Sequence, residues 1–327
     1  MLGIELTPEH PLDRLVDLGT AAESAGYDTI FVSSHYNNRS PFAALSRLAD
    51  ATATVRLGPG VVNPLERHPV TLAGEVATVA EASGGRAVFG IGPGDPSTLR
   101  NLGIERERPL RRVLETMQVA RTLWDGERVD HDGTFRARDA GLNFDAECVP
   151  VYVGAQGPDM LRMAGKHADG ALVNASHPTD VAWAADRIAE GRADRPAERG
   201  DFEAVVYAVT SVAADGDAAR AAARFPVAFV AAGAADPVLE RHDIDTAAAA
   251  SVAGAVEAGE FRTAAERVTE TMLDAFAVAG SPSEVAEGLT ALTEHADGLV
   301  AGWPLGPDPG EAIRLLGAAL DPANQER

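Results

Sequence analysis

The sequence of 327 residues is poor in cysteine and in lysine. It contains one cysteine, Cys148, and one lysine, Lys166. A single cysteine excludes a disulfide within the chain and therefore excludes a small secreted fold held together by disulfides. It fits a reducing compartment, so we expect a cytoplasmic protein.

Long hydrophobic runs are also missing. No apolar stretch approaches the roughly 20 residues that a membrane-spanning helix needs. Residues 1–6 carry no basic segment before their apolar run, which is unlike a secretory signal peptide, and they read as a strand that starts at once. We therefore expect no membrane partner.

Positive charge is scarce. There are 49 Asp and Glu residues against 28 Lys and Arg, a formal net charge of −21. Such a surface repels nucleic acid and anionic lipid, so neither is an expected partner. At about 1 M salt the screening length falls to roughly 3 Å and this self-repulsion nearly vanishes. A GC-rich genome would explain the missing lysine but not the excess of acid, so the composition favours a halophilic, archaeal-type protein.

Several catalytic patterns are absent as well. There is no His/Cys cluster for zinc, no Gly-x-x-x-x-Gly-Lys-Ser/Thr phosphate loop and no Gly-x-Ser-x-Gly nucleophile motif. What the chain does have is a glycine–proline loop at the end of four apolar runs. Glycine lets a backbone approach a ligand closely, and a following helix start suits an anion. These loops, which favour an organic cofactor over a metal, are residues 57–64, 89–95, 151–158 and 299–307.

Apolar strand-like runs alternate with helix-like segments along almost the whole chain. Eight such β-then-α units predict a closed (β/α)₈ TIM barrel, a single domain over residues 1–327. An open doubly wound sheet would place a glycine-rich turn after its first strand, but that strand ends Glu5-Leu6-Thr7-Pro8. The expected strands begin near residues 2, 27, 55, 87, 149, 170, 203 and 298.

Two segments interrupt this alternation. Residues 127–144 predict a hairpin insertion after the fourth helix. Residues 213–296 predict a helical insertion between strands seven and eight. Its helices are expected to break at Gly233, Asp236-Pro237, Gly254, Gly259 and Gly280.

Polar residues stand where the barrel strands end, which is where this fold places active sites. Glu5 lies in an otherwise apolar strand, where burial would raise its pKa and suit it to donate a proton; a solvated strand end is the alternative. His35 could be a ligand, a proton donor or a packed loop residue. The groups expected to converge are Glu5, residues 34–38, Asn63, Asp95, Gln156 and Asn174.

Several strings together carry a resemblance to a known family. The chain resembles the bacterial luciferase-like superfamily and, within it, the coenzyme F420-dependent 5,10-methylenetetrahydromethanopterin reductases. The resemblance extends from Gly3 to near Gly317, and Ser34 stands where the family usually has an aspartate. The strings are residues 34–38, 57–64, 67–69, 84–86, 90–95, 154–158, 169–176 and 238–245.

The resemblance implies a deazaflavin, coenzyme F420, at the C-terminal mouth of the barrel, with FMN as the alternative. It implies a non-prolyl cis peptide bond at Gly60–Val61 behind the ring, and backbone N–H groups of residues 155–157 on the cofactor phosphate. By this resemblance the cofactor-binding residues are Gly60, Val61, Asn63, Asp95, Ala155, Gln156, Gly157 and Asn174.

The implied reaction is hydride transfer from reduced F420 to a methylene-tetrahydropterin, giving the methyl form. Glu5 would be the catalytic acid, and His35, Tyr36 and Gln156 would contact the pterin. The one-carbon carrier is tetrahydromethanopterin or tetrahydrofolate, and a dimer or tetramer is implied. The alternatives are another F420-dependent oxidoreductase, an FMN-dependent monooxygenase or a non-catalytic deazaflavin-binding protein.

Overall fold

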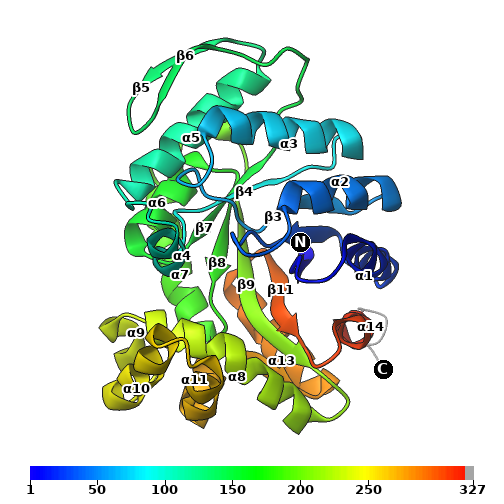
Figure 1. The fold of residues 1–327 in the computed structure, drawn as a ribbon, viewed down its shortest axis with the longest axis vertical. Coiled ribbons are helices and arrows are strands. Elements are labelled where there is room, and N and C mark those ends of the chain that lie inside the picture. Colours follow the sequence, from blue (N-terminus) through cyan, green and yellow to red (C-terminus); the bar gives the residue numbers. More distant parts are fainter. Residues whose placement is uncertain (321–327) are drawn as a thin grey trace. The chain divides into compact units, whose positions relative to one another are not determined.

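The computed structural model describes residues 1–320, along which strands and helices alternate (Figure 1). One sheet has the hydrogen-bonded strand order β3-β2-β1-β11-β9-β8-β7-β4, and β10 pairs with β9. Isolated bridges Leu57–Ala87 and Val62–Ile91 connect the β3 and β4 segments, so the eight main strands close into a barrel. The predicted (β/α)₈ fold is confirmed.

The strands fall close to the positions expected from the apolar runs. They are β1 (Leu2–Leu6), β2 (Thr29–Val32), β3 (Arg56–Pro59), β4 (Phe89–Ile91), β5 (Val129–Asp132), β6 (Arg136–Ala140), β7 (Val151–Ala155), β8 (Gly170–Asn174), β9 (Glu203–Val212), β10 (Val278–Gly280) and β11 (Gly298–Leu305).

Most helices begin at a proline, whose fixed φ suits the first turn and whose missing N–H costs nothing there. They are α1 (Leu12–Ser24), α2 (Pro41–Ala51), α3 (Pro69–Ser83), α4 (Pro96–Asn101), α5 (Pro109–Trp124), α6 (Pro158–His167), α7 (Pro178–Arg192), α8 (Gly216–Gly233), α9 (Asp236–Arg241), α10 (Thr246–Glu257), α11 (Phe261–Arg267), α12 (Glu270–Phe276), α13 (Pro282–Leu292) and α14 (Pro309–Leu320).

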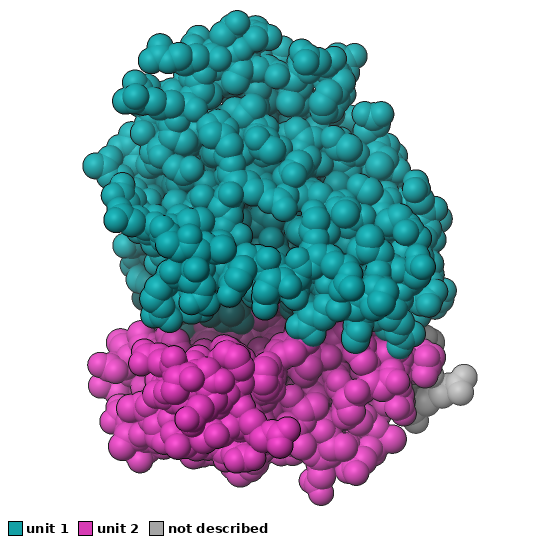
Figure 2. Space-filling view, in the orientation of Figure 1, with its two compact units in different colours: residues 1–174, 183–205 teal, residues 175–182, 206–327 magenta. Residues whose placement is uncertain are grey.

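The chain divides into two compact units, which Figure 2 colours separately. Unit 1 comprises residues 1–174 and 183–205, and unit 2 comprises residues 175–182 and the chain from 206 onward. Unit 1 holds β1 to β4, β7 and β8, and every residue expected to form the site. The site can therefore be described within unit 1 alone.

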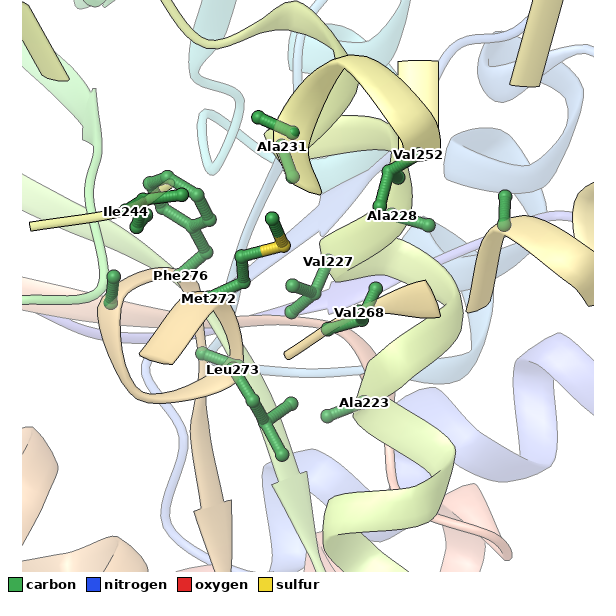
Figure 3. Close-up of a cluster of buried hydrophobic side chains, with 14 of the residues drawn as sticks. Ala223, Val227, Ala228, Ala231, Ile244, Val252, Val268, Met272, Leu273 and Phe276 are labelled. Atoms are coloured by element: carbon green, nitrogen blue, oxygen red, sulfur yellow. The ribbon is translucent and has the colours of Figure 1, made fainter. Parts of the chain in front are cut away.

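Unit 2 contains the predicted helical insertion between β9 and β11. Its helices have a core of their own, in which Val227, Met272 and Leu273 are almost completely buried (Figure 3). Burying each such side chain stabilises the folded protein by about 1.5–3 kcal/mol. This burial explains how an insertion made mostly of alanine-rich helices can pack into a folded unit.

Three details of the insertion and the last strand differ from expectation. Gly254 does not end a helix: it lies inside α10, where it is exposed and a helical glycine costs only about 1 kcal/mol relative to alanine. The three-residue strand β10 was not predicted because it is too short to show a period. The last glycine–proline loop is also partly strand, because β11 continues through Trp303-Pro304 to Leu305.

The predicted hairpin insertion is confirmed as β5 and β6, which are antiparallel and follow α5. Its turn lies against the buried carboxylate of Glu115 in α5. That carboxylate accepts hydrogen bonds from the Thr134 backbone N–H and hydroxyl, both at 2.7 Å, and from Arg111 Nε at 2.6 Å, and it contacts His131 Nε2 at 3.1 Å. These bonds outweigh the effect of burial and lower the pKa of Glu115 to about 2.

Candidate active site

The direction of the β2 side chains follows from one close contact with α1. A Cβ placed on Gly19 of α1 would lie 3.5 Å from Ile30 Cδ1, so Ile30 faces the helices. Side chains alternate along a strand, so Phe31 and Ser33 face the barrel interior. The parallel register pairs Glu5 with Phe31, which puts the Glu5 side chain on the same interior face.

The β4 and β7 side chains can be assigned in the same way. Phe89 makes an edge-to-face contact with Trp124 of α5, with ring centroids 5.9 Å apart, so Phe89 faces the helices and Gly90 the interior. The register pairs Gly90 with Tyr152, which puts Gly154 on the interior face as well. Both strands therefore present glycine to the barrel interior near its C-terminal mouth.

The Val61 side chain fits against these glycines. A Cβ on Gly92 would lie 2.6 Å from Val61 Cγ2, and one on Gly154 would lie 3.2 Å from the same atom. A Cβ on Gly90 would lie 1.9 Å from the Pro59 carbonyl oxygen. The end of β3 can pack this closely because β4 and β7 have no side chains there. Val61 thus forms one wall of the barrel mouth.

The expected non-prolyl cis peptide bond is present at Gly60–Val61. Two residues beyond this bond, the Asn63 side chain makes hydrogen bonds within the loop of residues 63–66. Its side-chain oxygen accepts from the Leu65 and Glu66 backbone N–H groups at 3.1 and 3.0 Å, and its Nδ2 donates to Glu66 Oε1 at 2.5 Å. The amide therefore fixes the loop that follows Val61, and its contact with a cofactor stays a prediction.

Asp95 has a local partner as well. Its carboxylate caps α4, accepting from the Thr98 backbone N–H at 2.8 Å and from the Ser97 hydroxyl at 2.5 Å. Partial burial would raise the pKa of Asp95, but these hydrogen bonds lower it overall. An ionised carboxylate at this strand end can still accept a hydrogen bond from a ligand.

The third loop joins β7 to α6 and contains Ala155, Gln156 and Gly157. Ala155 is buried, whereas Gln156 and Gly157 are exposed. Gly157 is the residue before the first turn of α6, and a Cβ there would meet nothing within 4 Å. The start of this ten-residue helix is open, and its unpaired N–H groups can bind an anion. On the next strand, Asn174 is exposed at the end of β8.

The remaining expected residues lie at the ends of β1 and β2. Glu5 is half-buried, and its Oε1 accepts from the Thr7 hydroxyl at 3.5 Å. His35 and Tyr36 are exposed in the turn that follows β2, and the Tyr36 hydroxyl accepts from Asn101 Nδ2 at 3.4 Å. Parallel strands bring these groups to one edge of the barrel.

One residue at this edge was not singled out from the sequence. Ser33 follows β2, faces the barrel interior and is only 2% exposed. The available signal was weak: it is a hydroxyl that ends an apolar strand. Within residues 1–320, no three His, Cys, Asp or Glu side chains gather in a way that could hold a metal ion, and no helix of these residues is long and apolar enough to cross a membrane.

The described chain is thus a barrel with polar groups at its strand ends and a glycine-lined wall at its mouth. Residues 2–297 match the family described as "Luciferase-like monooxygenase", and the chain belongs to it. A solved structure of the coenzyme F420-dependent tetrahydromethanopterin reductase from Methanopyrus kandleri matches with a TM-score of 0.90 and 35% identity, covering 98% of each chain.

Two curated relatives narrow this membership. The chain is 40% identical to the 5,10-methylenetetrahydromethanopterin reductase of Archaeoglobus fulgidus, covering 98% of both sequences. It is 39% identical to the protein of the same name from Methanolobus tindarius, over 97% of this chain and 98% of the relative. The chain therefore belongs to the 5,10-methylenetetrahydromethanopterin reductase family, and the recognition of that family from the sequence strings is confirmed.

Proposed function

We propose that this protein is a reductase that transfers hydride from reduced coenzyme F420 to the methylene carbon of methylene-tetrahydromethanopterin, giving the methyl form. Full-length relatives at 35–40% identity carry that name or describe that cofactor. The observation within the chain that carries the proposal is the wall made by Val61 against Gly92 and Gly154.

The residues present fit a flat ring with a charged tail. Interior glycines on β4 and β7 make room for the Val61 side chain, which presents an apolar surface to a ring, and the open start of α6 suits a phosphate. Val61 would support one face of the ring, and residues 155–157 would bind the phosphate through backbone N–H groups. Bound in its reduced form, the cofactor supplies the hydride, and the protein supplies orientation and electrostatics.

Glu5 is the residue proposed to handle the proton. It lies on the interior face level with Phe31, which is fully buried. A half-buried carboxyl in this position can donate its proton to the imidazolidine nitrogen that leaves the methylene carbon as their bond breaks, and the iminium that remains accepts the hydride. His35, Tyr36 and Gln156 are exposed around the same edge and are proposed to contact the pterin.

The test is a turnover assay at high salt with purified protein and reduced F420. Oxidation of F420 should depend on added methylene-tetrahydromethanopterin and should be slower with methylene-tetrahydrofolate. Faster turnover with methylene-tetrahydrofolate would show that tetrahydrofolate, and not tetrahydromethanopterin, is the preferred one-carbon carrier. Binding of F420 without turnover on either pterin would contradict a reductase.

We also propose that the enzyme is a cytoplasmic homo-oligomer, a dimer or tetramer. The lone cysteine in the sequence supports a reducing compartment. Phe225, Phe229 and Phe261 support an interface on unit 2, because they contact one another and each is 40–44% exposed. Light scattering during gel filtration tests this, and a monomer at every salt concentration would contradict it.

A further inference from the structure

Ser33 has a buried hydroxyl with no hydrogen-bond partner among residues 1–320. It is 2% exposed, so bulk water does not supply the missing partner. A buried hydroxyl without a partner destabilises a folded protein, and such groups are few in native structures. Because Ser33 lies at the C-terminal mouth of the barrel, beside the candidate site, the missing partner needs an explanation.

The surroundings of Ser33 all belong to the candidate site. The register pairs Val32 with Pro59, so Ser33 lies level with Gly60, and Gly60 N–H donates to the Val32 carbonyl at 2.9 Å. On the other side, Ser33 N–H donates to the Leu6 carbonyl at 3.2 Å. The hydroxyl therefore lies between the strand that carries Glu5 and the loop that carries Val61, one level closer to the mouth than Glu5.

The direction of the side chain follows from the contact between α1 and Ile30. Ile30 and Val32 face the helices, so Ser33 faces the interior. Tyr27 precedes the opposite end of the same strand and also has a buried hydroxyl without a partner among the described residues. Of these two residues, Ser33 lies at the C-terminal mouth and Tyr27 does not. A comparison of variants at the two positions therefore separates the effect of removing an unpartnered hydroxyl from the effect of removing one at the mouth.

We propose that the Ser33 hydroxyl binds a ligand ring directly, by a hydrogen bond to a pyrimidinone edge. Deazaflavins and pterins both carry such an edge, with carbonyl and ring-nitrogen groups that a hydroxyl can serve as donor and acceptor. The inference rests on the proposed function, because that function supplies the two rings. Ser33 is thus a substrate- or cofactor-binding residue additional to those expected from the family motifs.

The test compares Ser33→Ala with the matched control Tyr27→Phe. Three quantities are measured in each: the thermal midpoint of the ligand-free protein, the dissociation constant of F420 by fluorescence, and kcat and KM for the methylene-pterin. Both variants should keep or raise the midpoint, by about 1–3 °C, since each removes an unpartnered polar group. A Ser33→Cys variant, close in size and a weak donor, guards against a packing defect in the alanine variant.

Ser33→Ala should weaken binding by roughly three- to tenfold and Ser33→Cys by less, whereas Tyr27→Phe should leave binding unchanged. A change confined to the F420 dissociation constant identifies the cofactor as the partner, and a change confined to KM identifies the pterin. If the wild-type protein turns over the methylene-pterin, and the F420 dissociation constant and KM of Ser33→Ala both lie within twofold of the wild-type values, the role of Ser33 is overturned and the proposed function stands. A wild-type protein that binds neither ring overturns the proposed function and this inference together.

Discussion

Glycines at interior strand positions decide, residue by residue, whether a flat ligand can reach the wall of the barrel mouth. Val61 fits because Gly92 and Gly154 carry no side chain: a Cβ at either position would lie 2.6 or 3.2 Å from Val61 Cγ2. The consequence is that adding one methyl group at this point should affect ligand binding as well as folding.

Gly92→Ala should push Val61 away from its position. Its Cβ would come within 2.6 Å of Val61 Cγ2, and overpacking of this kind costs about 1–3 kcal/mol. We expect the dissociation constant of F420 to rise by at least about tenfold, measured by fluorescence titration. The control is Gly254→Ala, in the open middle of α10, which should leave binding unchanged and stabilise by about 0.5–1 kcal/mol. Unchanged F420 affinity in Gly92→Ala would contradict the assignment of Val61 to the wall.

Glu5→Gln should lower kcat by at least about 100-fold, because a positioned general acid contributes a factor of this order. F420 affinity should stay within twofold of the wild type, since the wall and the phosphate site lie on other strands. Glu9→Gln, four residues further on at an exposed position, is the matched control and should retain full activity. Turnover of Glu5→Gln at the wild-type rate would remove Glu5 from the chemistry.

At this scale the sequence predicted which residues stand at the strand ends but not how each side chain is used. Asn63 and Asp95 could be located by motif. However, Asn63 accepts a hydrogen bond from the following loop, and Asp95 accepts one from the first turn of α4. These bonds depend on backbone geometry, which the sequence does not give. Ser33 was missed because its significance is that it is buried without a partner. That property appears only when neighbouring strands are assembled.

At the scale of elements, the sequence predicted the regular alternation of strands and helices. It did not predict which side chains of each strand face the barrel interior. The strands Thr29–Val32 and Val151–Ala155 are almost entirely buried on both faces, so hydrophobicity does not mark an inside. The hairpin was visible from Asp132-Gly133 between two short polar strands. Its attachment to α5 through the buried Glu115 carboxylate and the Arg112 guanidinium, which donates to the Thr134 carbonyl, was not visible.

Glu115→Asn or Glu115→Gln should loosen the hairpin from α5. The folded-state pKa of Glu115 is about 2 against 4.5 for the free side chain, so its ionised form stabilises the fold above about pH 4.5. That contribution is lost as pH falls from about 4.5 through 2. We expect Glu115→Gln to lower the unfolding free energy by roughly 2–3 kcal/mol at pH 7, measured by urea denaturation, with a difference that shrinks below about pH 4.5. A difference independent of pH would assign the loss to packing.

At the scale of the whole molecule, the dominant physical property is charge. The formal net charge of −21 comes with one lysine in 327 residues. Acidic side chains are neutralised locally by arginine at several places, for example Arg220 with Glu270 and Asp274. The total still leaves strong repulsion at low ionic strength, which opposes the compact state.

We therefore predict that stability increases with salt. Between 0.1 and 2 M KCl the thermal midpoint should rise by several degrees, because the screening length falls from about 10 Å to below 3 Å. Sucrose at matched osmolality is the control and should give a smaller rise. A midpoint that is flat or falls with KCl would contradict the interpretation of the acidic composition as an adaptation to salt.

The most direct test of the proposed reaction follows one atom. Reduced F420 with both hydrogens of its hydride-bearing carbon replaced by deuterium is mixed with enzyme and methylene-tetrahydromethanopterin for a single turnover, and the methyl product is analysed by mass spectrometry. The account predicts one deuterium in the methyl group for each F420 oxidised. F420 oxidation with no deuterium in the methyl group, or with a label lost to water, would contradict direct hydride transfer at this site.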